Sequence, residues 1–149
     1  MSYSTASPLS SVEAIQGSFQ GKDIVSLDQF AVKDLYTVFH LAWQMKRLVL
    51  KSEPSQILAG KVISLLFFEP SSRTFGSFAS AIKRLGGQTV DIQNPETVTS
   101  VSKGETFEDT IRVFEAYSDA LVLRHPRAGA AQAAAEAAQF VPVVNAGDG

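Results

Sequence analysis

The run of polar side chains with the clearest chemical meaning is Ser71-Ser72-Arg73-Thr74. It follows a nearly continuous apolar segment, residues 61–68, and opens a segment whose apolar residues have helical spacing. The first N–H groups of a helix are unpaired and favour anions, and hydroxyl and guanidinium groups add donors to them. The run therefore predicts a site for a phosphoryl group. From spacing alone, a capped helix with a surface arginine is an equal alternative.

Arg124 is the second candidate ligand contact. It follows the apolar segment 120–123, which has the character of a buried strand. The carboxyl ends of parallel strands meet at one edge of a sheet, so we expect Arg73 and Arg124 to face one crevice. Two like charges held together are unfavourable, and a doubly negative ligand between them would account for both. The alternative for Arg124 is an ion pair with Asp119 or Glu136.

A polar stretch over residues 94–104, rich in Ser and Thr, is expected to form an exposed loop. A lysine in such a stretch is usually a solvated charge, and read alone Lys103 would be one too. Considered together with the two arginines, however, residues 99–105 become a third candidate group. Its polar members are Thr99, Ser100, Lys103 and Glu105.

Strands and helices alternate along the rest of the chain. Short apolar runs predict strands, and apolar residues at three- and four-residue steps predict helices. The expected strands cover residues 61–68, 88–93, 120–123 and 141–144, and the expected helices cover residues 32–51, 74–85, 106–117 and 128–139. This order predicts an α/β fold with a parallel sheet of four strands and helices on both faces, a three-layer, doubly wound, Rossmann-like arrangement preceded by an N-terminal helix.

The composition limits the classes of protein and ligand. The chain has 149 residues, of which 45% are hydrophobic and 19% charged, as in a single globular domain. Its formal net charge of −2 lacks the basic excess that nucleic-acid binding requires. It has no cysteine and two histidines, which excludes disulfides and thiolate metal sites and leaves little for a histidine site. We expect no cofactor and no metal.

The sequence contains no apolar run of the length that a signal peptide or a membrane span needs. We therefore expect a cytoplasmic protein with no membrane partner. Residues 1–20 are Ser-rich and contain Pro8, and we expect them to form a flexible tail before a domain over residues 21–149.

The two histidines are expected to be structural. For His125, a hydrogen bond near Pro126 is favoured over a ligand contact. His40 and Trp43 lie on or beside the apolar stripe of the helix expected at residues 32–51, where packing is the simpler role.

As a set, these motifs resemble those of the carbamoyltransferases, and in particular the N-terminal, carbamoyl-phosphate-binding domain of the aspartate carbamoyltransferases. Phe67-Phe68-Glu69-Pro70-Ser71-Ser72-Arg73-Thr74 matches the family pattern of Phe, any residue, Glu or Lys, any residue, Ser, Gly or Thr, Arg and Thr. Ser72 departs from the Gly or Thr of the pattern but keeps the hydroxyl of Thr. Segments 103–105, 124–127 and 141–149 follow in the family's order, so the resemblance covers roughly residues 20–149.

The resemblance implies roles for the candidate residues. Those that would hold the phosphate of carbamoyl phosphate are Ser71, Ser72, Arg73 and Thr74. Thr74 and Arg124 would also reach the carbamoyl oxygen, which makes Arg73, Thr74 and Arg124 the expected catalytic residues. Lys103, with Thr99 or Ser100, would close over the site of a neighbouring subunit in a homotrimer. Glu105 would pair with Arg73 across that interface.

The resemblance also implies the reaction. The amine of L-aspartate would attack the carbamoyl carbon of carbamoyl phosphate, giving N-carbamoyl-L-aspartate and phosphate in pyrimidine biosynthesis, with no metal and no covalent enzyme intermediate. The family's His-Pro-Thr-Gln segment and aspartate-binding domain are expected beyond Gly149. We therefore expect the isolated chain to bind carbamoyl phosphate weakly or not at all and to be inactive.

Three alternatives stay open at this point. The first is an ornithine carbamoyltransferase domain, whose phosphate motif is nearly the same. A loop lysine such as Lys103 suits a dicarboxylate better than the cationic ornithine, which favours the aspartate enzyme. The second is a non-catalytic trimerisation module. The third is a flavodoxin-like phosphate or nucleotide binder that shares only the architecture, which the absence of a Gly-rich first loop makes remote.

Overall fold

The computed structural model of the chain describes residues 13–52, 54–93 and 105–149. The described helices and strands follow one another as η1 (Leu27–Gln29, a 3-10 helix), α1 (Val32–Leu50), β1 (Val62–Phe67), α2 (Ser72–Arg84), β2 (Gln88–Gln93), α4 (Phe107–Glu115), β3 (Ala120–His125), α5 (Ala130–Ala137) and β4 (Val143–Asp148).

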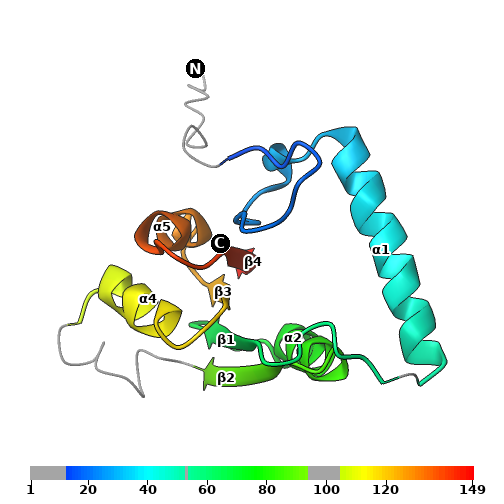
Figure 1. Cartoon of the computed structure of the whole chain (residues 1–149). Coiled ribbons are helices and arrows are strands. Elements are labelled where there is room, and N and C mark those ends of the chain that lie inside the picture. Colours follow the sequence, from blue (N-terminus) through cyan, green and yellow to red (C-terminus); the bar gives the residue numbers. More distant parts are fainter. Residues whose placement is uncertain (1–12, 53, 94–104) are drawn as a thin grey trace.

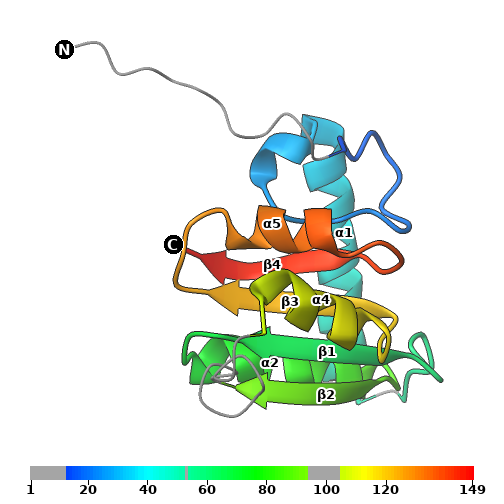
Figure 2. The same ribbon diagram turned by 90° about the vertical axis from the view of Figure 1, so that its left-hand side faces the viewer.

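The four strands form one parallel sheet in the order β2-β1-β3-β4. Helix α2 covers one face of the sheet and α4 and α5 cover the other (Figures 1 and 2). The expected α/β fold, with a parallel sheet between two helical layers and a helix before it, is therefore confirmed. In the register of β1 with β3, Phe67 lies opposite Arg124. The turn after β1 and the end of β3 consequently meet at the same edge.

Two hydrophobic clusters lie on the two faces of the sheet. Neighbouring residues of a strand point to opposite sides, so an apolar strand such as β1 can supply both clusters. The cluster under α2 contains the buried residues Ile63, Leu65, Phe67, Ala79, Ile82 and Val122. The cluster under α4 and α5 is larger and includes Leu66, Phe68, Ile111, Phe114, Leu121, Leu123 and Ala134. These two layers fix the strands that carry the candidate site.

Some boundaries differ from those that the sequence predicts. The last strand was expected at residues 141–144, but β4 runs from Val143 to Asp148, so Asn145 to Asp148 belong to the strand and not to a following loop. Pro142 has no N–H to give to a ladder, and only its carbonyl pairs, with the N–H of Leu121. Helix α2 begins at Ser72 rather than Thr74, which brings Ser72 and Arg73 into its first turn.

The segment before α1 is held against the edge of β4. Ile24 forms a parallel bridge with Val144, and the buried side chain of Gln29 bonds to four backbone groups along residues 13–26. A flexible tail was expected over residues 1–20, but within residues 13–20 the chain is held in place at Ile15. This residue is 0% exposed, and its N–H donates to the carbonyl of Gln29. A buried apolar side chain with a paired backbone anchors this stretch.

Helix α1 lies on the same side of the sheet as α2 but stands away from the strands (Figures 1 and 2). Only Asp34 is buried in this helix, where its carboxylate accepts from the N–H groups of Gly17 and Ala31. The expected packing of His40 and Trp43 is not observed, because both side chains are exposed. The guanidinium of Arg47 lies over the Trp43 ring, 4.8 Å from the ring centroid. The apolar stripe of α1 therefore lies largely at the surface of the described chain.

Candidate ligand site at the carboxyl edge of the sheet

The first part of the candidate site is the turn between β1 and α2. Ser71 occupies the N-cap position of α2, and its carbonyl accepts from the N–H of Phe75. Its hydroxyl does not cap the helix but bonds to the hydroxyl of Thr74, with 3.0 Å between the oxygens. The N–H groups of the first turn of α2 are therefore left without a side-chain cap. This is the arrangement that an anion can complete.

The second part of the site is the side chain of Arg124 at the end of β3. One terminal nitrogen, Nη2, forms an ion pair with Glu69 Oε2 at 3.0 Å, and the other, Nη1, donates to the carbonyl of Ala146 at 3.1 Å. The side chain of Arg124 is 25% exposed and that of Glu69 is 42% exposed. Residues from the turn after β1 and from β4 thus converge on the guanidinium that β3 carries.

The Nε–H of Arg124 is buried and has no hydrogen-bond partner in the described chain. A buried polar donor without a partner is uncommon and costs roughly 1–3 kcal/mol. Arg124 therefore retains a hydrogen-bonding capacity that its protein neighbours do not use.

Gly147 makes room for Arg124. Its φ is +123°, a conformation that favours glycine, and a Cβ built on it would lie 2.3 Å from Nη1 of Arg124. Any other residue here would displace the guanidinium or the strand. Sequence reasoning missed both Gly147 and Glu69 as supports of Arg124, although both lie in segments that carry the family resemblance.

The ion pairs expected for Arg124 as alternatives are wrong. Asp119 pairs with Lys61, with 2.7 Å between Oδ1 and Nζ, and it lies at the other edge of the sheet. Glu136 accepts from Gln132, one turn earlier in α5. The actual partner is Glu69, so Arg124 is not an unpaired charge that needs a dianion to balance it. What supports a ligand here is the geometry of Arg124 and its unused donor, and not a need to balance charge.

Arg73 lies in the first turn of α2, where its side chain is exposed and forms no ion pair with another described residue. The register and the turn after β1 bring Arg73 and Arg124 to the same edge of the sheet. Glu105 is half-buried just before α4. Thr99, Ser100 and Lys103 lie outside the described residues.

His125 has the structural hydrogen bond that the sequence predicts. Its Nδ1 accepts from the backbone N–H of Arg127 at 2.9 Å, across Pro126. The ring also packs against two phenylalanines, with ring centroids 4.9 Å from Phe68 and 5.4 Å from Phe107. These contacts account for its position without a ligand.

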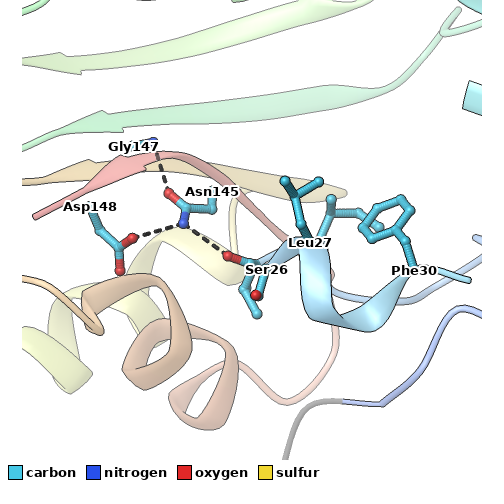
Figure 3. A pocket seen from close by; sticks show the side chains of 8 residues that line it. Ser26, Leu27, Phe30, Asn145, Gly147 and Asp148 are labelled. Atoms are coloured by element: carbon cyan, nitrogen blue, oxygen red, sulfur yellow. Dashed lines mark hydrogen bonds between the residues drawn. The ribbon is translucent and has the colours of Figure 1, made fainter. Parts of the chain in front are cut away.

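A pocket of about 420 Å³ lies between the end of β4 and the segment before α1 (Figure 3). Its polar side chains bond to one another and to backbone: Asn145 donates to Asp148 and to the carbonyl of Val25, and it accepts from the N–H of Gly147. The second carboxylate oxygen of Asp148 accepts from the N–H of Ala131. This network fixes the end of the strand next to Arg124.

Across the described ranges, no three carboxylate or imidazole groups come together as metal ligands would. In the same part of the chain, no helix combines the length and the apolar character that crossing a bilayer requires.

The comparison with protein families agrees with this geometry. Residues 22–149 match the family described as "Aspartate/ornithine carbamoyltransferase, carbamoyl-P binding domain". The chain belongs to this family of carbamoyl-phosphate-binding domains.

The individual relatives that the chain resembles are aspartate carbamoyltransferases. The chain is 48% identical over 131 residues to aspartate carbamoyltransferase 2, chloroplastic, of Pisum sativum, covering 88% of this chain and 34% of the relative. It is 45% identical over 132 residues to the aspartate carbamoyltransferase catalytic subunit of Methanosarcina barkeri, covering 89% of this chain and 42% of that protein.

Solved structures give the same result. The aspartate transcarbamoylase of Trypanosoma cruzi, in complex with carbamoyl phosphate and aspartate, matches 89% of this chain with a TM-score of 0.82 and 46% identity. The match covers 41% of that chain. The present chain thus spans well under half the length of the relatives it matches.

Proposed function

We propose that this chain forms the carbamoyl-phosphate-binding half of an aspartate carbamoyltransferase. The observation that carries the proposal is the state of Arg124. Its guanidinium is held in place by Glu69 and Ala146, and its buried Nε–H has no hydrogen-bond partner in the described chain. The N-terminus of α2, which has no side-chain cap, lies at the same edge of the sheet. Carbamoyl phosphate offers what this edge lacks, namely a phosphoryl group and a carbonyl oxygen that accept hydrogen bonds. The family membership and the relatives' names support the same substrate.

The proposed phosphate contacts are the side chains and N–H groups of the first turn of α2. Ser71, Ser72, Arg73 and Thr74 would surround the phosphoryl oxygens, which the positive end of the helix dipole also favours. Binding there would require Ser71 and Thr74 to exchange their mutual hydrogen bond for bonds to the ligand. Arg73 is exposed, so it can turn toward the anion without breaking an ion pair to another described residue.

The proposed chemistry is transfer of the carbamoyl group to L-aspartate. The unprotonated amine attacks the carbamoyl carbon, a C–N bond forms, and the carbonyl electrons move onto oxygen to give a tetrahedral intermediate. Collapse of the intermediate breaks the bond between the carbamoyl carbon and the phosphate oxygen. Phosphate leaves with the bonding electrons and takes up the proton that the new nitrogen loses. Thr74 and Arg124 would donate to the oxygen that becomes negative, which is where preorganised donors lower the barrier.

The aspartate contacts, the oligomeric state and the compartment are part of the same proposal. L-Aspartate would bind with the help of a second, aspartate-binding domain. The match covers only 34% and 42% of two relatives, which leaves length for such a domain. In a homotrimer, Lys103 with Thr99 or Ser100 would reach a neighbouring subunit's site, and Glu105 would pair with Arg73 across the interface. A cytoplasmic location is our proposal, and the plant relatives are by name chloroplast proteins. Mass measurement in solution tests the oligomeric state, and cell fractionation tests the compartment.

An ornithine carbamoyltransferase is the second candidate, because the family description covers both enzymes. The relatives we compared are aspartate carbamoyltransferases, which favours the first candidate. A non-catalytic trimerisation module is less well supported, since it gives no reason for the unused donor of Arg124.

The test measures the binding of ligands to the isolated 149-residue chain. NMR monitors the titration, because it detects affinities in the millimolar range. Carbamoyl phosphate, freshly dissolved, and inorganic phosphate are titrated into the wild-type chain and into Arg73→Ala, with the exposed Arg112→Ala in α4 as the matched control. We expect shifts at residues 71–74 that Arg73→Ala reduces and Arg112→Ala retains. We expect no carbamoyl-aspartate from this chain alone. Binding that Arg73→Ala leaves unchanged, or that Arg112→Ala reduces equally, would place the anion elsewhere and contradict the proposal.

A further inference from the structure

Three aromatic rings from three different elements contact one another beside Arg124. We call Phe68, Phe107 and His125 the three-ring cluster. The ring centroids of Phe68 and Phe107 are 5.5 Å apart, and the imidazole of His125 lies 4.9 Å from the first and 5.4 Å from the second. The Phe107–His125 pair is edge-to-face at 80°, a favourable aromatic geometry. The cluster is therefore a specific packing unit.

Each ring is attached to a part of the candidate site. Phe68 immediately precedes Glu69, the partner of Arg124, and its own N–H donates to the carbonyl of Arg124 at 2.8 Å. His125 directly follows Arg124 in β3. Phe107 begins α4, two residues after Glu105. The cluster thus ties together the turn after β1, the end of β3 and the start of α4.

The hydrogen bond of His125 defines the state of its ring. A backbone N–H can only donate, so the Nδ1 that accepts from Arg127 carries no proton. The imidazole is therefore neutral, with its proton on Nε2. A neutral ring packs between two phenyl rings at little desolvation cost, and it adds no third positive charge between Arg124 and Arg127.

We propose that His125 is a positioning residue, whose neutral ring between Phe68 and Phe107 sets the place of the Arg124 guanidinium relative to the turn that begins α2. The ring does this through packing and does not touch the ligand. The inference builds on the proposed function, which supplies the ligand. It predicts that a looser cluster weakens ligand binding in a chain that is still folded, whereas a purely structural ring would affect only stability.

The test compares variants that separate the ring from its hydrogen bond. His125→Ala removes both, and His125→Phe keeps an aromatic ring but loses the Nδ1 acceptor. His40→Ala, at an exposed histidine of α1, is the matched control. Affinities for inorganic phosphate and carbamoyl phosphate are measured by NMR titration of the full chain, with thermal unfolding in parallel. We expect His125→Ala to lower affinity about 10-fold and His125→Phe to restore it to within about 3-fold of wild type. Wild-type affinity in folded His125→Ala would overturn the proposal.

A second readout needs no ligand. The Nε–H of Arg124 is buried, so in ¹⁵N-labelled protein it should give a distinct resonance that exchanges slowly with water. We expect His125→Ala to move that resonance and speed its exchange, and His40→Ala to change neither. If the isolated wild-type chain binds neither anion measurably, this resonance alone decides the positioning role: no change in His125→Ala refutes it. If His125→Ala does not fold, Phe107→Leu enters the same comparison with the same expected result.

Discussion

The two ends of the parallel sheet carry similar residues in different states. At the amino ends of the strands, the Asp119 carboxylate accepts from the N–H of Val62 and pairs with Lys61, and the Asp23 carboxylate accepts from the N–H of Val143. At the carboxyl ends, Arg124 has a buried donor with no partner in the described chain. Charge alone does not mark a functional site. What separates the two ends is whether their hydrogen-bonding groups are already satisfied.

This contrast predicts opposite consequences for mutations. Changes at the amino ends should alter the free energy of unfolding and leave anion binding intact. Changes at the carboxyl ends should alter anion binding more than stability.

Arg124→Ala should have the largest effect on binding. It removes a charged donor group that the strands hold in place, and loss of such a partner costs about 2 kcal/mol or more, or about 30-fold in affinity. The free energy of unfolding should change much less, because the Glu69 carboxylate left behind is partly exposed to water. Titration with carbamoyl phosphate and chemical denaturation measure the two quantities. Affinity close to that of wild type would remove Arg124 from the site.

Gly147→Ala should weaken binding and stability together. The new Cβ would meet Arg124 Nη1, and its backbone conformation is unfavourable for alanine. We expect about a 10-fold loss of phosphate affinity from the displaced guanidinium, and roughly 1–2 kcal/mol of destabilisation.

Gly60→Ala is the matched control for this substitution. Gly60 also has a positive φ, +76°, but a Cβ there would meet nothing within 4 Å. It should lose stability by backbone strain alone and keep its affinity. Equal affinity losses in the two variants would show that the clash with Arg124 is not the cause.

Lys61→Met should have a small effect on stability and none on binding. The substitution removes the ion pair with Asp119 at the amino ends of the strands, where both side chains are partly exposed and the pair is screened by water. Thermal unfolding should show a slight fall in the midpoint temperature, and added salt should reduce the difference. A clear loss of phosphate affinity would contradict the division between the two ends of the sheet.

Asp23→Asn should change the pH dependence of stability slightly. Burial raises the pKa of Asp23, more than the hydrogen bond from Val143 lowers it, so the folded chain binds this proton more tightly than the unfolded chain does. The charged form therefore disfavours folding above the ordinary pKa of 3.8. An asparagine, which can still accept from Val143, should stabilise the chain by less than about 1 kcal/mol at neutral pH, and the gain should vanish below the ordinary pKa.

Asp119→Asn is the opposite case. The pKa of the Asp119 carboxyl is lowered, first by the hydrogen bond from Lys61 and then by that from Val62. The charged carboxylate therefore stabilises the folded chain above pH 3.8, and this stabilisation is lost as the pH falls through the lowered pKa. Denaturation between pH 3 and 7 measures the difference in the free energy of unfolding between each variant and wild type. This difference should rise with pH for Asp23→Asn and fall with pH for Asp119→Asn. Parallel slopes would contradict the assigned burial of Asp23.

Much of the fold could be predicted from local sequence. The continuous apolar run of β1, the helical spacing after Thr74 and the side-chain cap of Thr106 on the N–H of Asp109 are short-range signals, and the structure shows each of them. The placement of α1 was less predictable, because an apolar stripe shows that a helix has a contact face but not what that face meets. Its stripe lies largely exposed in the described chain.

The order of strands and helices follows from the amino-acid sequence alone. So does the presence of hydroxyl and guanidinium groups after β1 and at the end of β3, because both depend on residues that are neighbours in the chain. The pairing of Arg124 with Glu69 and not with Asp119, and the space that Gly147 leaves for Arg124, become visible in three dimensions alone. The reason is that such pairings depend on strand register and on backbone conformation, which bring together residues separated by more than twenty positions.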